Sequence, residues 1–421
     1  MFGVGDVNRT ILHCDCNNFY ASVECLYHPE LRGLAVAVSG DPELRHGIVL
    51  AKNYEAKKYG VKTGNPLWLA RQLCPNIVFV PPHFDLYMQF SKMCRQIYSQ
   101  YSDRVEPYGL DECWIDVTGS TWQLGNGESI ANSIREKIKS ELGITISAGV
   151  SFNKIFSKLG SDYKKPDATT VIPFDGFREI VWPMPVSSLL FVGRATANLL
   201  QRKRIDTIGK LAQTDRRYVK DWLGKCGETL WLYANGYDTS PVAAIGERPV
   251  IKSIGNSTTM PRDLTSYDEM KITLMVLSES VAARLRQHNL QCDTVQISIR
   301  GTNLSWIERQ GKLTAPCCDS TTIYLKAHEL IKKHHQNGKP VRSLGVRACN
   351  LSARGFEQIS FIPSVQKSRS HERVEEVLDN LRSRFGNKIV QRGIMLTDSA
   401  LSALDPQTDY HNLALSSVHS Q

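Results

Sequence analysis

The sequence predicts a multidomain protein of mixed helices and strands, an α/β or α+β fold. Its 421 residues suffice for about two to four domains that each bury a core. Residues 1–173 alternate strand-like and helical patterns, whereas residues 174–240 are helical and compact. A stretch bounded by prolines at 241–249 then precedes a second α/β segment at 250–357. The alternation in the first segment predicts a partly antiparallel sheet with helices packed on it.

Short apolar runs bounded by turn-forming residues predict the strands of the first segment. These runs are residues 10–15, 35–38, 48–51, 77–80, 110–117 and 144–150. The clearest helix covers residues 128–142, because an isoleucine or leucine recurs every four positions and Gly143 supplies a C-terminal stop.

Three carboxylates stand where two of these strands meet turns. Asp15 closes the first run, and Asp111 with Glu112 lies at the start of another. Acids near a buried strand are costly unless something pairs with them, and hard oxygen ligands suit Mg²⁺. Successive strand residues point to opposite faces, so Asp111 and Glu112 converge only if the backbone bends, which Gly109 permits. The sequence therefore predicts a magnesium site.

The net charge of +9 is unevenly distributed. Residues 1–173 and 358–421 each carry equal numbers of basic and acidic side chains, so the whole excess lies in 174–357. This separation predicts that one part of the chain holds a polyanion and another part processes it. The alternative is a solvated basic surface without a partner.

Several classes of protein are disfavoured. The chain has no apolar stretch long enough to span a membrane and no secretory pattern near its start, so we expect a cytoplasmic protein without a membrane partner. Its 11 cysteines lack both zinc spacing and paired spacing, which is typical of buried thiols in a reducing compartment.

Residues 191–209 predict a helix-hairpin-helix. Gly193 occupies one of the two glycine positions usual in such a turn, and Phe191 replaces the other. A hairpin of this kind presents backbone N–H groups to a DNA phosphate; an ordinary helical pair is the alternative. In the next segment, alternating strands at 295–300 and 344–348 place Arg300 and Arg347 where they face either a duplex backbone or solvent.

Four motifs resemble those of the Y-family DNA polymerases, the translesion group, over roughly residues 10–355. They are Asp-Cys-Asn-Asn-Phe-Tyr-Ala-Ser-Val-Glu at 15–24, Asn-Tyr-Glu-Ala-Lys-Lys-Tyr-Gly-Val-Lys at 53–62, Leu-Asp-Glu at 110–112 and Ser-Asp-Tyr-Lys-Lys-Pro at 161–166. The resemblance implies a right-hand polymerase. Its parts are the palm at 8–18 and 83–173, fingers at 19–82, thumb at 174–240, linker at 241–249, little finger at 250–357 and a tail at 358–421.

The same resemblance implies an activity: addition of deoxynucleotides to the 3′ end of a primer on a DNA template, with low fidelity, in repair and damage tolerance. Asp15 and Asp111 would bridge two Mg²⁺ ions, Glu112 would complete the site, and the backbone carbonyl of Cys16 would be a further ligand. The implied partners are primer–template DNA and the deoxynucleoside triphosphates.

The resemblance also assigns the nucleotide contacts. Tyr54, Lys57 and Lys165 would bind the triphosphate, and Phe19 would lie at the nucleotide. Tyr20 would act as a steric gate, whose ring collides with a ribose 2′-hydroxyl; otherwise both aromatic residues are core residues. This sequence departs from the family at three positions, one of which is Gly109 in place of a usual serine, a change that loses no ligand. Lys57 stands where many relatives have Arg, which loses a bidentate fork, and Ala51 stands where a threonine is common.

The tail carries two weaker patterns. Residues 358–362 loosely resemble a sliding-clamp peptide, with Gln358 and Phe361 as its contacts; a plain strand or linker is equally open. Further on, Val374, Val377, Leu378, Leu381 and Phe385 share one helical face.

Two other classes of function remain as alternatives. A nucleotide cyclase or a nuclease shares paired acids on a palm-like sheet but does not require Tyr20, a thumb hairpin and a basic C-terminal domain together. A non-catalytic DNA-binding factor would tolerate a broken acidic trio, whereas Asp15, Asp111 and Glu112 are all present.

Overall fold

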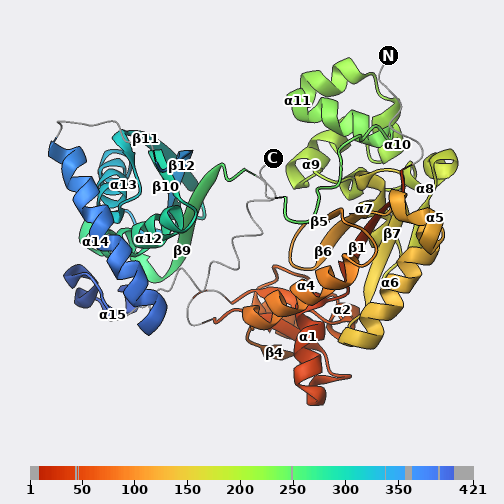
Figure 1. Ribbon diagram of the computed structural model, residues 1–421, viewed down its shortest axis with the longest axis horizontal. Coiled ribbons are helices and arrows are strands. Elements are labelled where there is room, and N and C mark those ends of the chain that lie inside the picture. The colour runs from red at the N-terminus through yellow and green to blue at the C-terminus, as the bar shows by residue number, and fades with distance from the viewer. Residues whose placement is uncertain are drawn as a thin grey trace. The chain divides into compact units, whose positions relative to one another are not determined.

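The computed structural model describes residues 9–42, 45, 47–247, 250–336, 338–355, 363–386 and 389–402. The chain forms two compact units (Figure 1). The first contains Met1–Gly40 and Ile48–Glu247, and the second contains Asp41–Gly47 and Arg248–Gln421. Among the described residues, no helix combines the length and apolar character that crossing a bilayer requires.

A five-stranded sheet organises the first unit, in the order β5-β6-β1-β7-β8. Its strands are β5 (Val105–Pro107), β6 (Glu112–Asp116), β1 (Ile11–Cys16), β7 (Ile146–Ser151) and β8 (Thr169–Ile172). The central strand β1 runs antiparallel to both β6 and β7, whereas β8 is parallel to β7. The partly antiparallel sheet expected from the sequence is therefore confirmed.

Helices cover both faces of this sheet. On one face, Leu12 and Cys14 of β1 share a core with α4 (Phe84–Tyr98) and α6 (Gly127–Leu142). The predicted helix at 128–142 is thus confirmed, and Gly143 ends it at φ +69°. On the other face lies α7 (Lys154–Tyr163), where the side chain of Ser161 bonds that of His13.

Two glycines let α7 lie directly on the sheet. A Cβ atom built on Gly149 of β7 would stand 1.9 Å from the carbonyl oxygen of Ser157. A Cβ on Gly160 of α7 would stand 3.0 Å from the Cα of Gly149. Helix and strand therefore meet backbone to backbone, which fixes the depth at which the side chains of α7 enter the site.

The three-stranded sheet β3-β2-β4 forms a separate layer of the first unit. It consists of β3 (Val49–Lys52), β2 (Val36–Ser39) and β4 (Val78–Val80), which confirms all three strands expected here. Helices α1 (Phe19–Tyr27), α2 (Tyr54–Lys58) and α3 (Leu67–Leu73) accompany it, with the 3₁₀ turn η1 (Pro29–Leu31).

The helical part predicted at 174–240 is also present. It contains η3 (Phe174–Gly176), α8 (Phe177–Val181), η4 (Val186–Ser188), α9 (Arg194–Arg202), α10 (Ile208–Gln213) and α11 (Arg216–Ala234). Two short helical segments, η2 (Thr118–Ser120) and α5 (Thr121–Leu124), lie earlier in the chain, between β6 and α6. Non-helical dihedrals at Gly224 kink α11.

The expected linker at 241–249 is partly bound to the sheet. Val242 is fully buried against Ile11 and Trp114, and the backbone N–H of Ile245 donates to the carbonyl of Asp103 at 2.9 Å. The linker therefore stays a prediction, and its first half is anchored because Val242 completes a small apolar cluster.

The second unit is a four-stranded antiparallel sheet in the order β11-β10-β12-β9. Its elements follow as β9 (Ser253–Leu264), α12 (Tyr267–Gln287), β10 (Leu290–Gly301), β11 (Trp306–Cys317), α13 (Ser320–His334) and β12 (Val341–Ala353). Helices α12 and α13 bury one face of the sheet with residues such as Val295 and Ile297. The tail adds α14 (Pro363–Phe385), η5 (Gly393–Thr397) and α15 (Ser399–Ser402) to this unit (Figure 1).

Candidate active site

Asp15 and Glu112 lie side by side on one face of the large sheet. The two residues are directly paired across β1 and β6, so their side chains project on the same side. That side is the one covered by α7, away from the apolar core formed with α4 and α6. Burial raises the pKa of Asp15, although the ammonium of Lys158 opposes the shift.

Asp111 joins this pair through a bend before β6. Gly109 adopts φ +150°, and the carbonyl of Asp111 accepts a hydrogen bond from the Cys16 N–H at 2.9 Å. Burial and the nearby negative charges of Glu112 and Asp15 raise the pKa of Asp111 to about 7. The three carboxylates therefore act on one another electrostatically, as the bend at Gly109 was expected to allow.

Cys16 can serve this site only through its backbone. Its thiol is buried in the core, 4.0 Å from the Sγ of Cys94. Burial and this contact hold the pKa of the Cys16 thiol far above its ordinary value, so the sulfur stays protonated.

Two lysines reach the carboxylates from α7 and the turn after it. The Nζ of Lys158 lies 3.2 Å from Asp15 and 2.9 Å from Glu112. The Nζ of Lys165 lies 2.9 Å from Asp15 and 2.9 Å from Asp162. Although burial opposes it, these carboxylates raise the pKa of both lysines above the ordinary value. Both ammonium groups are therefore charged.

Sequence reasoning missed three members of this network: Lys158, Asp162 and His13. Strand alternation alone places His13 on the same face as Asp15, two residues away. Helical spacing places positions 158 and 162 on one face of α7, but their approach to the acids depends on the packing of that helix against β7. The buried His13 lies 2.8 Å from the Ser161 hydroxyl through Nδ1 and 3.4 Å from Glu112 through Nε2.

The donor set suits a hard divalent cation. Among the described residues, no three His, Cys, Asp or Glu side chains are arranged as a ready metal cage. Lysine ammonium groups instead contact the oxygens of Asp15 and Glu112. Three clustered carboxylates, one with its pKa raised by the others, are the oxygen ligands that Mg²⁺ prefers, so the residues present fit the ion.

A cationic group lies beside the acids, on and before α2. The Nζ of Lys57 lies 5.4 Å above the ring centre of Tyr54 and makes no ion pair with another described residue. Lys52, at the end of β3, was not singled out from sequence. Burial, followed by the charges of Lys57 and Lys165, lowers its pKa. Lys52 and Lys57 have no carboxylate partner among the described residues, and such uncompensated like charges suit a polyanionic ligand.

Tyr20 packs against other aromatic rings near Asp111. Its ring lies parallel to that of Tyr87 at 4.3 Å and meets Phe84 edge-on at 5.9 Å. Burial and the charge of Asp111 raise its pKa to about 12, so the hydroxyl remains neutral and close to the acids. Phe19 instead points into the core with 3% exposure, so its side chain does not line the site and only its backbone is available to a nucleotide.

The expected DNA contacts occupy open surfaces of their own units. Gly193 caps α9, Phe191 before it adopts φ +69°, and a Cβ on Gly193 would meet no atom within 4 Å. In the second unit, Arg347 is exposed and pairs across the sheet with Gln296, two residues from Ser298 and four from Arg300. Both arginines therefore lie on the face opposite α12 and α13. Gln358 and Phe361 lie outside the described residues.

Comparisons with known proteins agree over most of the chain. Residues 14–162 match the model of the impB/mucB/samB family, and residues 251–361 match the model of that family's C-terminal domain. A protein of Acetivibrio thermocellus named DNA polymerase IV is 53% identical over 94% of this chain and 100% of its own length. A Bacillus subtilis protein named DNA polymerase IV 1 is 35% identical over 92% of this chain and 94% of its own length.

A solved structure shares the fold. A Y-family DNA polymerase chimera superimposes with a TM-score of 0.71 over 82% of this chain and all of its own chain, at 23% identity.

Proposed function

Because this chain belongs to the impB/mucB/samB family of Y-family DNA polymerases, we propose that its acidic trio joins deoxynucleotides to a primer 3′ end. It is a DNA-directed DNA polymerase. The observation that carries the site assignment is the direct pairing of Asp15 with Glu112 on the face that also receives Lys165.

Different residues of the chain would bind different parts of the nucleotide. Lys165, Lys57 and Tyr54 bind the triphosphate, and Lys52 adds a further positive charge beside them. The ring of Tyr20 packs beneath the sugar and excludes a 2′-hydroxyl, and the stack on Tyr87 keeps that ring from moving aside. Two Mg²⁺ ions held by Asp15, Asp111 and Glu112 would neutralise the triphosphate and activate the primer hydroxyl.

The order of the elements supports a right-hand arrangement. We assign the palm to the five-stranded sheet with α4, α6 and α7, and the fingers to the three-stranded sheet with α1 to α3. The thumb corresponds to α8 through α11 and the little finger to the sheet of the second unit. The basic excess at 174–357 falls within these last two parts, which supports a role in holding duplex DNA.

The cellular role follows from the family. We assign it to translesion synthesis during DNA repair and damage tolerance. All 11 cysteines are free and most are buried, which supports a reducing compartment, the cytoplasm.

Primer extension on a templated duplex tests the activity. We expect the wild type to extend with Mg²⁺ and the double variant Asp111→Ala/Glu112→Ala to lose extension. Glu128→Gln, an exposed carboxylate at the start of α6, is the matched control and should extend normally. A wild type that extends nothing, or that cuts DNA or cyclises nucleotides without a template, would refute the proposal.

The tail segment at 358–362 remains a prediction of clamp binding. Replacement of Gln358 and Phe361 by alanine should abolish retention on a purified bacterial sliding clamp while leaving short primer extension intact. Undiminished retention would assign the segment to a plain connection between β12 and α14.

A further inference from the structure

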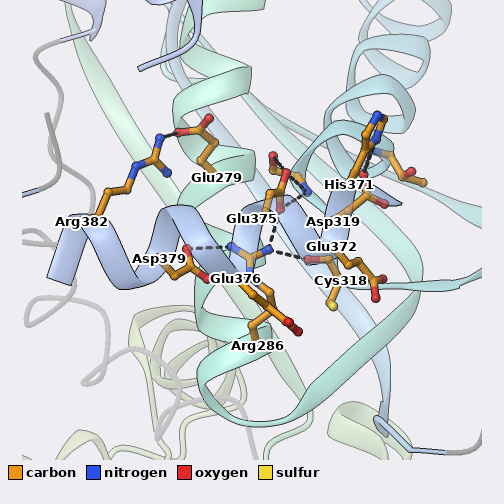
Figure 2. Close-up of polar contacts among 12 residues, drawn as sticks. Glu279, Arg286, Cys318, Asp319, His371, Glu372, Glu375, Glu376, Asp379 and Arg382 are labelled. Atoms are coloured by element: carbon orange, nitrogen blue, oxygen red, sulfur yellow. Dashed lines mark hydrogen bonds and ion pairs between the residues drawn. The ribbon is translucent and has the colours of Figure 1, made fainter. Parts of the chain in front are cut away.

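Helix α14 packs on the second unit through charged residues. Glu375 is buried with 5% exposure and accepts hydrogen bonds from the backbone N–H of Ser320, at the start of α13, and from Arg286 at 2.6 Å. Asp379 forms a two-pronged pair with the same arginine, at 2.6 and 2.9 Å (Figure 2). The guanidinium of Arg286, in the last turn of α12, thus binds the centre of α14.

Further ion pairs extend this contact along the helix. Arg382 donates to Glu279 of α12 at 2.9 Å (Figure 2). Towards the other end, Glu372 accepts from the backbone N–H of Cys318 at 3.0 Å, and Glu376 accepts from Arg354 at 2.8 Å. All four carboxylates of α14 are therefore neutralised by partners on the unit itself.

The apolar stripe of α14 faces solvent instead. Val374 is 58% exposed, Val377 59% and Phe385 61%, while Leu378 and Leu381 are half-buried. A helix on a globular surface ordinarily buries its apolar stripe and exposes its charges. Here the arrangement is inverted, and nothing in the described part of the chain covers the stripe.

Two arginines give this outer face a positive charge. Arg373 and Arg384 are exposed, and neither has an ion pair with a described residue. The guanidinium of Arg384 lies 5.5 Å from the ring centre of Phe385, at the end of the stripe. Since the acidic residues are already paired, the outer face combines apolar side chains with uncompensated cations.

We propose that the outer face of α14, defined by Val374, Val377, Leu381, Phe385, Arg373 and Arg384, docks an acidic amphipathic helix of a partner protein. The stripe is about 17 Å long, the span of roughly three helical turns, which matches recognition of one helix by another. A glutamate beside the partner's apolar residues would pair with each arginine. This inference is independent of the polymerase assignment.

A second copy of the chain fits this face poorly. Two such helices would bring Arg373 and Arg384 of one copy close to the same residues of the other in parallel or antiparallel pairing, and like charges repel at that separation. A single stripe of this length also buries far less than the roughly 1,200 Å² of a stable interface. A charge-matched partner helix avoids the repulsion, and with the same small contact area it would bind transiently.

Fluorescence anisotropy with the full-length protein tests the proposal. The probe is a labelled synthetic helix with leucines on one face and flanking glutamates, and its counterpart carries lysines at the flanking positions. We expect the wild type to bind the glutamate helix at least about tenfold more tightly. Val377→Ser/Phe385→Ser should lose that binding, and Arg373→Glu/Arg384→Glu should invert the preference. Leu325→Ser, at an exposed position on α13, is the matched control and should change nothing.

Three results would overturn the proposal. The first is equal binding of both helices, or binding that the double variants leave intact. The second is a wild-type dimer, measured by light scattering, that Val377→Ser/Phe385→Ser converts to a monomer. The third is markedly stronger binding after Leu413→Ser/Leu415→Ser, because the chain's own C-terminal segment would then be the occupant. Normal primer extension and circular dichroism in each variant establish that it is folded.

Discussion

Lys158 places a positive charge among the acids through the side chain of one residue. Its ammonium group contacts Asp15, Glu112 and Asp162 within 3.3 Å. Removing one partner of a buried ion pair is strongly destabilising because it leaves a charge uncompensated, whereas another cation at the same place restores the balance. If these carboxylates bind a divalent ion as proposed, that ion would compensate the same charges as Lys158.

Lys158→Met should consequently make the stability of the protein depend on Mg²⁺. Without added Mg²⁺ we expect a loss of about 3 kcal/mol in the free energy of unfolding, and addition of Mg²⁺ should recover much of it. Differential scanning calorimetry with and without Mg²⁺ measures both effects. Lys154→Met removes a comparable buried pair, that with Glu106 at 2.6 Å, away from the acids. The Lys154→Met variant should be destabilised, and Mg²⁺ should not restore its stability. Equal restoration of stability by Mg²⁺ in both variants would contradict the prediction.

Tyr20 is the residue that we expect to choose the sugar. Tyr20→Ala removes the ring near Asp111, so ribonucleotide incorporation should rise by at least about tenfold while deoxynucleotide incorporation continues. Primer extension with each nucleotide type gives the ratio. Tyr27→Ala, at the exposed end of the same helix α1, serves as the control. Sugar discrimination that is unchanged in Tyr20→Ala would remove the gate assignment.

At the scale of elements, sequence periodicity predicted the helices and strands that bury an apolar face. It did not predict how α14 is oriented, because ion pairs with distant residues decide that. The four-residue repeat and Gly143 were enough for α6, and alternation was enough for β10 and β12. The five apolar positions of α14 were found on one face, but their exposure was not foreseeable. That outcome depends on Arg286 and on the N–H groups of α13, which are distant in sequence and bind the opposite face.

The first turn of α9 can separate stability from DNA binding. Gly193 has extended dihedrals that any residue adopts and open space at its Cβ. Gly193→Asp should stabilise the helix by a few tenths of a kcal/mol, because Asp is a preferred cap, yet repel a phosphate at the same N–H groups. Thermal unfolding and DNA titration measure the two effects. Gly193→Ala should bind DNA nearly as the wild type, and equally weak binding by both variants would disprove the charge argument.

The start of α12 carries a carboxylate whose contribution depends on pH. Although burial opposes it, the N–H of Thr265 and the guanidinium of Arg262 lower the pKa of Glu269 to about 2. A lowered pKa means that the stabilisation is complete above the ordinary value of 4.5 and is lost as the pH falls towards 2.

Glu269→Gln should therefore reduce the urea midpoint of unfolding near neutral pH. The difference from the wild type should shrink as the pH falls below about 4.5. Glu329→Gln, whose lysine partner lies on the surface of α13, is the control and should show little difference at any pH. A difference for Glu269→Gln that grows on acidification would contradict the assignment.

At the scale of the whole molecule, charge is divided between parts. The acids lie in the first unit, and the open sheet face with Arg300 and Arg347 belongs to the second. This division was predictable from the sequence because it needs only counting. The bend that brings Asp111 towards Asp15 was expected from Gly109. The burial of Val242 could not be derived from local pattern, because it needs a contact with a strand more than 200 residues away.

Arg347 should contribute to DNA affinity through charge alone. Arg347→Ala should weaken binding to all duplex sequences alike and reduce the slope of log affinity against log salt by about one. Arg309→Ala, at an exposed arginine that pairs across the sheet with the helix-facing Ile297, should leave the slope unchanged. Titrations at several salt concentrations decide between these outcomes, and a sequence-dependent loss would indicate base contacts instead.

The close contact of Gly149 with Gly160 should make these two residues, which carry no functional group, as intolerant of substitution as the acids. A methyl group on Gly149 would lift α7 from β7 and move Lys158 and Asp162 outward, although no polar atom had been altered. A methyl group on Gly160 would lie 3.0 Å from the Cα of Gly149 and would require a smaller shift. In a screen of random variants these two positions should thus score as inactive beside Asp15. Each glycine makes room for the other's backbone. A larger side chain at one position therefore cannot be compensated by a smaller one at the other, because glycine is already the smallest residue, and we expect both positions to stay glycine during evolution.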